Sequence, residues 1–241
     1  MTRPSLPESL ASPESKAPYV RRLFATIADR YDLITRVLSY GRDAAWKRRL
    51  VALSDAGSAT RALDVACGTG DIAFALAERG ARVTGLDLTL RMLQLARAKA
   101  VSRPAVAFTT GDMMALPFGD ARFDLVTAGY GLRNVPSLQP AIDEIRRVLR
   151  PGGLLLSLDF NRPSNAVVRA IYLGYLTIVG STLGWLLHRD PDTYRYIPES
   201  IKRYPGADGV AALLERSGFE KCRVVPLLGG LMAINVATRG T

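Results

Sequence analysis

The chain has 241 residues, of which 48% are hydrophobic and 22% are charged. This length supports one substantial hydrophobic core and favours a single folded unit. The chain has one histidine, His188, and two cysteines, Cys67 and Cys222. This composition excludes a disulfide framework and a metal site built from several histidines or cysteines, and it disfavours hydrolases that depend on histidine.

Basic residues outnumber acidic ones and are unevenly placed. The chain carries 32 Lys and Arg against 22 Asp and Glu, a net charge of +10. Residues 1–60 and residues 161–241 each hold 10 basic and 6 acidic side chains, whereas residues 61–160 hold 12 and 10. The excess outside the middle is compatible with ordinary solvated faces, with binding to nucleic acid, or with an anionic membrane surface.

The first part of the chain divides into two segments. Residues 1–17 are rich in proline and serine and contain no apolar run that could serve as a secretory signal. We expect a flexible segment there and, with two free cysteines, a cytoplasmic location. Residues 18–241 should form a single domain. Within it, residues 18–55 should be a helical cap, because their apolar residues recur at helical spacing.

Strand and helix patterns alternate through residues 61–160. Short aliphatic strand candidates fall at residues 61–66, 82–87, 105–109, 123–128 and 154–158, and helical patterns fall at residues 71–79, 90–100 and 139–149. Such alternation requires right-handed crossovers and a parallel sheet that is covered on both faces. We therefore predict a doubly wound α/β fold.

The end of the chain adds a helical segment and a hairpin. In residues 161–205 the run 170–188 is uncharged and apolar, and we interpret it as a lid over the active site, a helix in the membrane interface, or core. Residues 206–241 should contain a helix and two further strands, 222–227 and 231–238. Too few residues separate these strands for a crossover, so they should pair antiparallel and complete a mostly parallel, seven-stranded sheet.

A glycine-rich turn follows the first predicted strand. It reads Asp64-Val-Ala-Cys-Gly68-Thr-Gly70-Asp71, and Asp87 ends the next strand. Ligands bind at this point of an open α/β sheet, and an acid at the second position holds ribose hydroxyls. The pattern is shared by binders of NAD and of S-adenosylmethionine, and it is also compatible with a tight turn and a solvated acid.

Acidic residues at the strand ends separate the two cofactors. Asp64 lies inside the strand, where dinucleotide binders usually have an apolar residue, and Asp112 follows the third strand. Carboxylates suit the ammonium and sulfonium of S-adenosylmethionine better than a pyrophosphate. With the Leu149–Gly153 turn, these features resemble class I S-adenosylmethionine-dependent methyltransferases over residues 61–158.

A narrower resemblance comes from five segments elsewhere. They are Tyr31-Asp32, Trp46-Lys47, Ala115-Leu-Pro-Phe118, Gly131-Leu-Arg-Asn-Val135 and Arg195-Tyr-Ile-Pro-Glu-Ser-Ile201. Over residues 21–237 the chain resembles the ubiquinone and menaquinone biosynthesis C-methyltransferase family. The resemblance implies methylation of a ring carbon of a prenylated quinol, most directly demethylmenaquinol, with S-adenosylmethionine as donor. It makes residues 61–160 the cofactor-binding core and residues 161–205 the substrate segment.

The resemblance also assigns site residues. The predicted cofactor-binding residues, which include those of the glycine-rich turn, are Asp64, Gly68, Thr69, Gly70, Asp87, Leu88, Asp112, Met113 and Gly129. Arg133 and Asn134 would stabilise and orient the ring oxygen. The proton would pass through water to Asp71 or to Tyr31-Asp32. No metal is implied, because the sulfonium donor carries its own leaving group.

The chain departs from the family where relatives have Gly-x-His-Arg-x-Trp-Lys and this chain reads Gly41-Arg-Asp-Ala-Ala-Trp-Lys47, and again at Ile34-Thr35 and at Asn235, where relatives have Met-Asn and histidine. These departures leave open another small or lipid acceptor, such as a phenol oxygen. A non-catalytic scaffold of a quinone-making assembly is a second alternative. A nucleic-acid partner is not expected, because the chain shows no base pocket and no separate basic module. The partners implied are the quinol and an anionic membrane surface at which the enzyme is peripheral, and a homodimer is left open.

Overall fold

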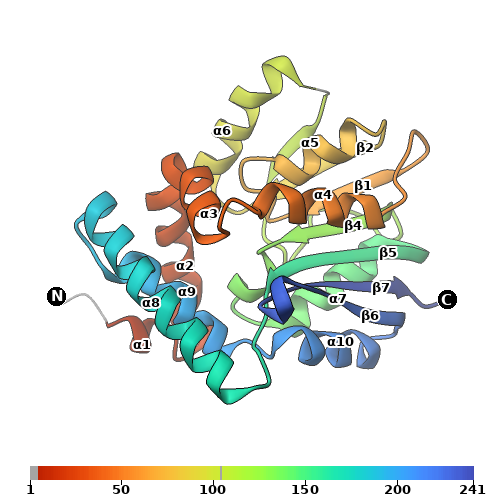
Figure 1. The fold of residues 1–241 in the computed structure, drawn as a ribbon. Helices are drawn as coiled ribbons and strands as arrows, with labels where there is room; N and C mark the ends of the chain where they lie inside the picture. The colour runs from red at the N-terminus through yellow and green to blue at the C-terminus, as the bar shows by residue number, and fades with distance from the viewer. Residues whose placement is uncertain (1–4, 104) are drawn as a thin grey trace.

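The computed structural model describes residues 5–103 and 105–241, and a seven-stranded sheet lies at its centre (Figure 1). The strands are β1 (Arg61–Val65), β2 (Arg82–Asp87), β3 (Ala107–Thr110), β4 (Phe123–Gly129), β5 (Leu149–Phe160), β6 (Phe219–Leu227) and β7 (Met232–Arg239). Their order is β3-β2-β1-β4-β5-β7-β6. β7 runs antiparallel to β5 and β6, and the other neighbours are parallel. The predicted doubly wound fold and its C-terminal hairpin are confirmed.

Helices cover both faces of the sheet. They are α1 (Leu6–Ser9), α2 (Pro13–Ile27), α3 (Tyr31–Leu38), α4 (Asp43–Leu53), α5 (Asp71–Ala77), α6 (Leu90–Lys99), α7 (Leu138–Val148), α8 (Ala166–His188), α9 (Asp192–Arg203) and α10 (Gly206–Arg216). Apolar residues of α4 and α5 pack on one face, and those of α7 and α10 pack on the other. The helices α1, α2, α3, α8 and α9 gather beyond the sheet, on its cap side (Figure 1).

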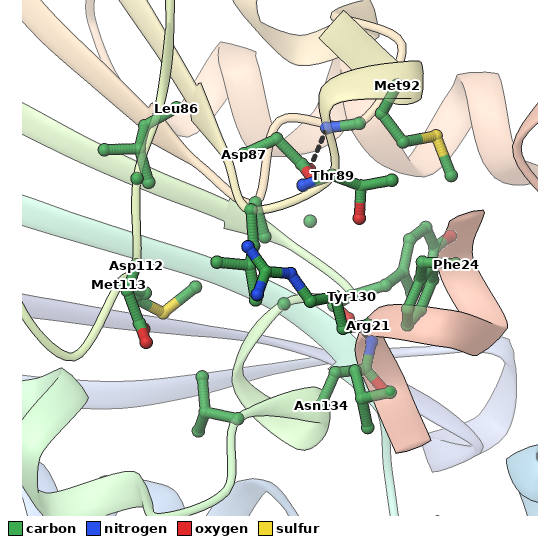
Figure 2. Close-up of a pocket in the computed structure, with 18 of the residues that line it drawn as sticks. Arg21, Phe24, Leu86, Asp87, Thr89, Met92, Asp112, Met113, Tyr130 and Asn134 are labelled. Atoms are coloured by element: carbon green, nitrogen blue, oxygen red, sulfur yellow. Dashed lines mark hydrogen bonds between the residues drawn. The ribbon is translucent and has the colours of Figure 1, made fainter. Parts of the chain in front are cut away.

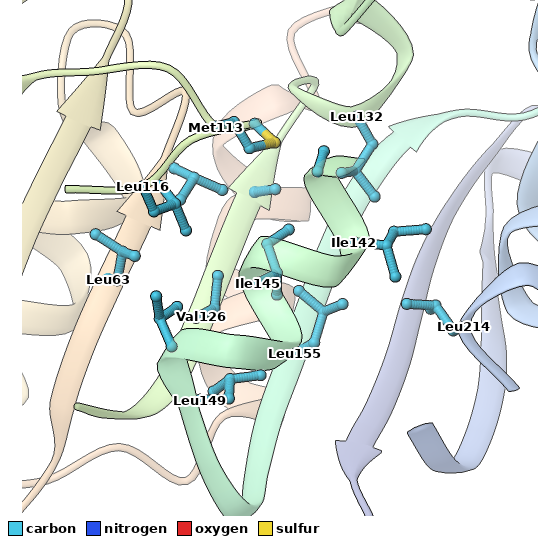
Figure 3. Close-up of a cluster of buried hydrophobic side chains, with 14 of the residues drawn as sticks. Leu63, Met113, Leu116, Val126, Leu132, Ile142, Ile145, Leu149, Leu155 and Leu214 are labelled. Atoms are coloured by element: carbon cyan, nitrogen blue, oxygen red, sulfur yellow. The ribbon is translucent and has the colours of Figure 1, made fainter. Parts of the chain in front are cut away.

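The larger core lies between α7 and the sheet. Ile142 and Ile145 of α7 point toward Val126 of β4 and Leu155 of β5 (Figure 3). All four side chains are fully buried. Burying one such side chain contributes about 1.5–3 kcal/mol relative to leaving it in water. This packing makes the sheet a rigid base whose strand ends hold the site residues in place.

The expectation of a flexible segment over residues 1–17 is wrong for its described part. From Ser5 onward the chain forms α1 and begins α2, and residues 1–4 lie outside the described residues. The prolines stand in the first turns of these helices, and Ser5 and Ser12 form capping boxes. Proline and serine favour these helix-start positions. Leu6 and Leu10 are buried against the cap, which fixes the segment in place.

Two glycines allow the α8–α9 hairpin to pack closely. A Cβ atom at Gly180 would lie 3.1 Å from the carbonyl oxygen of Tyr194, and one at Gly184 would lie 2.5 Å from that of Asp190. Both obstacles are backbone atoms, so no rotamer change could relieve the clash. The small residues at these positions therefore set how closely α8 approaches α9.

Replacing Gly184 with valine should lower the free energy of unfolding by about 1–3 kcal/mol, because overpacked sites force backbone shifts. Gly174 is the matched control, since it lies in the same helix with nothing within 4 Å of its Cβ position. Urea denaturation should show a lower midpoint for Gly184→Val and an unchanged or higher one for Gly174→Val. Equal midpoints would contradict this account of the hairpin.

Candidate active site

A rigid turn joins β1 to α5 at the carboxyl end of the sheet. Gly68 and Gly70 have φ values of +54° and +88°, in the left-handed region that favours glycine. A Cβ atom at Gly70 would also lie 2.8 Å from the Phe74 ring. Asp87 fixes the turn, because its carboxylate accepts hydrogen bonds from the backbone N–H of Gly68 at 2.8 Å and of Thr89 at 2.7 Å (Figure 2). Burial raises the pKa of Asp87, and these hydrogen bonds oppose that rise.

A cavity opens above this turn, at the ends of β1, β2 and β4, and we call it the strand-end cavity. Six of the nine predicted cofactor residues line it: Gly68, Asp87, Leu88, Asp112, Met113 and Gly129. The cap supplies its other wall, and Arg21 and Phe24 of α2 point into it (Figure 2). The predicted residues thus share one cavity although they come from four separate segments of the chain.

Two further predicted cofactor residues, Asp64 and Thr69, line a smaller pocket beside the cavity. Asp64 is buried, and its Oδ1 accepts a hydrogen bond from Thr127 at 2.7 Å. Its Oδ2 has no hydrogen-bond partner within the described residues. Burial raises the pKa of Asp64 to about 7, although the Thr127 hydrogen bond and Lys47 oppose this rise. Asp64 is therefore a buried acceptor without a protein donor for its second oxygen. Gly70, the last of the nine predicted cofactor residues, contributes by shaping the turn.

An apolar chamber lies between α2, α3 and α9 and the loop after β4. Its apolar lining residues are Leu23, Phe24, Ile27, Tyr31, Ile34, Leu38, Trp46, Tyr130, Phe160, Tyr194, Tyr196 and Ile197. Phe24, Tyr31, Tyr130 and Asn134 line both this chamber and the strand-end cavity. The two spaces therefore adjoin, so a donor in one can face an acceptor in the other.

Arg133 lines the apolar chamber, and its guanidinium is held from several sides. Its Nε donates to Asp159 at 3.1 Å, its Nη1 donates to Ser200, and its guanidinium lies over the rings of Phe160 and Tyr196. Both members of the ion pair are almost fully buried. Burial raises the pKa of Asp159, and the charge of Arg133 opposes that rise.

Asn134 lies at the boundary of the two spaces, and its amide is fixed as well. Its Nδ2 donates to the carbonyl of Tyr130 at 2.6 Å, and its Oδ1 accepts from the Tyr196 hydroxyl at 2.9 Å. Arg133 and Asn134 thus both line the chamber with side chains that protein partners hold in place, and their predicted roles toward the ring oxygen stay predictions.

The predicted proton acceptors lie elsewhere. Asp71 bonds Lys47 at 2.9 Å and Lys99 at 3.3 Å, and it lines the small pocket rather than the chamber. Burial alone would raise the pKa of Asp71, but the two lysines hold it below its usual range. Asp32 is half exposed, pairs with Lys99 at 2.6 Å, and accepts from Thr69 at 2.7 Å. The structure brings Tyr31 to the chamber but ties both carboxylates into a lysine network outside it.

Sequence reasoning missed Tyr130 and Asp43. Tyr130 lines the strand-end cavity, the small pocket and the apolar chamber, and its hydroxyl donates to Asp43 Oδ1 at 2.7 Å. The other Asp43 oxygen bonds Lys47 at 2.6 Å. The signal was present in part, because Asp43 stands where relatives have histidine. Its partner, 87 residues away, could not be found without the fold.

Comparison with known proteins supports the family assignment that the sequence motifs suggested. The model of the ubiE/COQ5 methyltransferase family matches residues 12–239. A demethylmenaquinone methyltransferase of Thermus thermophilus is 41% identical over 220 residues, which cover 90% of this chain and all of the relative. One from Staphylococcus aureus strain JH9 is 34% identical over 94% of this chain and 95% of its own.

Solved structures agree on the fold. A SAM-dependent methyltransferase of Thermotoga maritima, described as a possible histamine N-methyltransferase, has a TM-score of 0.68 at 18% identity over 91% of this chain and 99% of its own. A SAM-dependent methyltransferase of Aquifex aeolicus has a TM-score of 0.63 at 15% identity over 89% and 97%. The family match and the identity to relatives over almost their whole length carry the conclusion. This chain belongs to the ubiE/COQ5 methyltransferase family.

Proposed function

We propose that the protein transfers a methyl group from S-adenosylmethionine to a ring carbon of a prenylated quinol, converting demethylmenaquinol to menaquinol. The observation that carries this proposal is the pair of adjoining spaces. One has Asp87 and Asp112 at the strand ends in its lining, and the other is lined mainly by apolar and aromatic side chains, which suit a quinol ring. The names of the relatives supply the acceptor.

The residues present fit the methyl donor. Asp87 would hold the ribose hydroxyls and Asp112 and Met113 the adenine, since all three line the strand-end cavity and each carboxylate oxygen can accept further hydrogen bonds. The unpartnered Oδ2 of Asp64 suits the donor's ammonium. When bound, S-adenosylmethionine supplies an electrophilic methyl group on a sulfonium. The protein must hold the ring carbon in line with the methyl–sulfur bond, exclude water and accept one proton.

Tyr130 and Asp43 provide a route for that proton. A quinol hydroxyl in the chamber can donate to the Tyr130 hydroxyl oxygen, whose own proton already points to Asp43. As the quinol loses its proton to Tyr130, Tyr130 passes one to Asp43, and the carboxylate becomes a carboxylic acid. Arg133 and the Asn134 amide then face the negative ring oxygen and stabilise it. After methyl transfer the ring carbon loses its hydrogen as a proton and the ring oxygen regains one, so the quinol is restored and one proton is released in total. This route replaces the predicted one through Asp71 or Asp32, because Asp43, although it also pairs with Lys47, accepts a hydrogen bond from a residue that lines the chamber.

The reaction itself is the direct test. Purified protein with S-adenosylmethionine and reduced demethylmenaquinone should yield menaquinol, detected by mass spectrometry as the gain of one methyl group. The oxidised quinone is the control and should give no product, because its ring carbon lacks the electron-donating hydroxyls. A deletion strain should accumulate the quinone lacking that methyl group. An unchanged quinone profile in the strain would reject the proposal.

Donor affinity should depend on pH through Asp64. The ammonium prefers an ionised carboxylate, and the pKa of Asp64 in the free protein is about 7 because of burial. Below that pH the proton must leave before the donor binds, so the Kd should rise by up to about tenfold per pH unit. Isothermal titration calorimetry between pH 5.5 and 7.5 measures this, and Asp64→Asn should flatten the slope. A wild-type Kd that is constant over this range would contradict the role of Asp64.

The partner and location follow from the acceptor. A prenylated quinol is dissolved in a lipid bilayer, so the enzyme should work at the cytoplasmic surface of the membrane. The net charge of +10, concentrated outside residues 61–160, supports attraction to anionic lipid. Such attraction should fade with salt, because exposed charges are screened beyond about 8 Å at physiological ionic strength.

A further inference from the structure

One face of α8 is apolar and exposed along its whole length. Val167, Ile171, Ile178 and Trp185 are 67%, 69%, 70% and 53% exposed. Their spacing places them on one side of the helix, where exposed Gly174 and Thr182 fill the gaps. Isolated exposed apolar residues are common on protein surfaces, but a continuous stripe of them marks an interaction site.

The stripe continues onto α3, which lies beside α8. Leu33 and Val37 lie one turn apart on α3 and are exposed, and Tyr40, in the turn that follows α3, is exposed as well. Tyr40 stacks on Tyr175 of α8, with ring centroids 5.3 Å apart. We call the exposed apolar residues of α8 and α3 the α8–α3 face. It lies on the cap side of the molecule, away from β6 and the C-terminus (Figure 1).

The two segments that carry this face are rich in arginine. Residues 161–189 contain Arg162, Arg169 and Arg189 and no acidic residue. Residues 30–42 contain three more arginines, and their one acid, Asp32, is paired with Lys99. Arg189 lies over the Trp185 ring at 5.1 Å, which joins the basic rim to the apolar stripe. A second copy of the chain would bring arginines against arginines, whereas an anionic lipid surface complements both the apolar stripe and its rim.

The length of α8 raises the alternative of a membrane span. With 23 residues and a mean hydropathy of 1.5 over its most apolar window, it could cross a bilayer by length and composition. Its other face, however, is built into the fold: Tyr172, Leu176, Gly180 and Gly184 are buried. Gly180 packs against α9, and Gly184 packs against the turn that precedes α9. If α8 crossed a bilayer, it would lose these packing contacts with the rest of the fold. A helix that is buried on one side and apolar on the other is suited to lying in the interface plane.

We propose that the α8–α3 face lies in the headgroup region of an anionic membrane, with the α8 stripe toward the acyl chains and the arginines at the phosphates. This inference rests on the proposed function for the lipid quinol and adds the surface by which the enzyme reaches it. Val179, Leu183 and Leu187 of α8 pack in the same cluster as Ile34 and Leu38, which line the apolar chamber. In this orientation the chamber wall packs against the membrane-facing helix, and the proposal is that the prenyl tail remains in lipid while the ring enters the chamber.

Co-sedimentation with vesicles tests the surface. The full chain should bind vesicles that contain phosphatidylglycerol much more tightly than vesicles of phosphatidylcholine alone. The double variant Ile171→Asp/Ile178→Asp should bind the anionic vesicles roughly tenfold more weakly or worse. Val101→Asp is the matched control, because Val101 is 92% exposed in a different part of the molecule, and its binding should not change. Arg162→Glu/Arg189→Glu should remove the preference for anionic lipid.

Activity and oligomeric state separate the possible outcomes. The isoleucine double variant should keep its turnover of a detergent-dispersed, short-tailed quinol and lose turnover of a long-tailed quinol presented in vesicles. Unchanged vesicle binding by this variant would overturn the inference. Light scattering that shows the variant dissociating a dimer, with vesicle binding unaffected, would assign the face to a second copy instead. If the wild-type protein binds vesicles through this face but methylates no quinol, only the proposed function fails.

Discussion

Replacing Arg133 with alanine should lower the free energy of unfolding by about 3–5 kcal/mol and abolish turnover. The stability loss arises because Asp159, buried and paired through its Oδ1 with Arg133 Nε, would lose its ion-pair partner and remain a buried charge that is held by backbone N–H groups. The loss is a large fraction of the 5–15 kcal/mol, roughly, that stabilises an ordinary domain. Guanidinium denaturation measures it, and loss of activity by this variant would then say nothing about catalysis.

A charge-neutral double variant separates folding from chemistry. Arg133→Gln/Asp159→Asn removes both charges together and keeps groups that can hydrogen bond, so its stability should remain much closer to wild type than that of Arg133→Ala. If Arg133 stabilises the ring oxygen from the chamber wall, kcat should still fall by about 10²–10³, the usual loss when one such donor is removed. Donor affinity should not change, because Arg133 does not line the strand-end cavity. A stable double variant with wild-type turnover would make Arg133 purely structural.

Local chemistry made the cofactor half of the site predictable. The strand ends that carry Asp64, Asp87 and Asp112 are marked by short aliphatic runs and by the glycines that follow the first of them. Parallel strands bring their carboxyl ends to one edge, so residues found separately in the sequence had to meet there. The parallel pairing of the first five strands was predicted from the alternation in the same way, whereas their order in the sheet comes from the structure.

The acceptor half depends on contacts that no local pattern encodes. Arg133 was selected from its motif, but its partner Asp159 comes from the far end of β5. The composition of residues 5–17 suggested a flexible segment, and only the packing of Leu6 and Leu10 on the cap reveals why prolines and serines stand there as helix starts. The uncharged run in α8 was equally compatible with lid, core and interface. One face of that helix is buried and the other exposed, a distinction that hydropathy alone does not make.

Tyr130→Phe should lower kcat by about 10²–10⁴, the range typical for loss of a positioned proton acceptor, with little effect on donor affinity. The variant removes one hydroxyl and keeps the ring, which packs 5.7 Å from Phe160. Tyr31→Phe is the matched control. Tyr31 lines the same three spaces, but the hydrogen bond to Asp43 belongs to Tyr130, so the control should retain most activity. Activity lost in Tyr31→Phe and kept in Tyr130→Phe would restore the route through Tyr31 and Asp32.

Asp43→Asn tests the other end of the same route. An amide oxygen can still accept the Tyr130 hydrogen bond, but it is far less basic than a carboxylate, so kcat should fall while the KM for the quinol changes little. Asp43→Glu should recover part of the rate. If the two residues act in one route, the double variant Tyr130→Phe/Asp43→Asn should be no slower than the worse single variant. Each single variant already blocks the same proton route, so the second substitution removes nothing more. Losses that multiply in the double variant would instead mean independent roles, with Asp43 acting through its ion pair to Lys47.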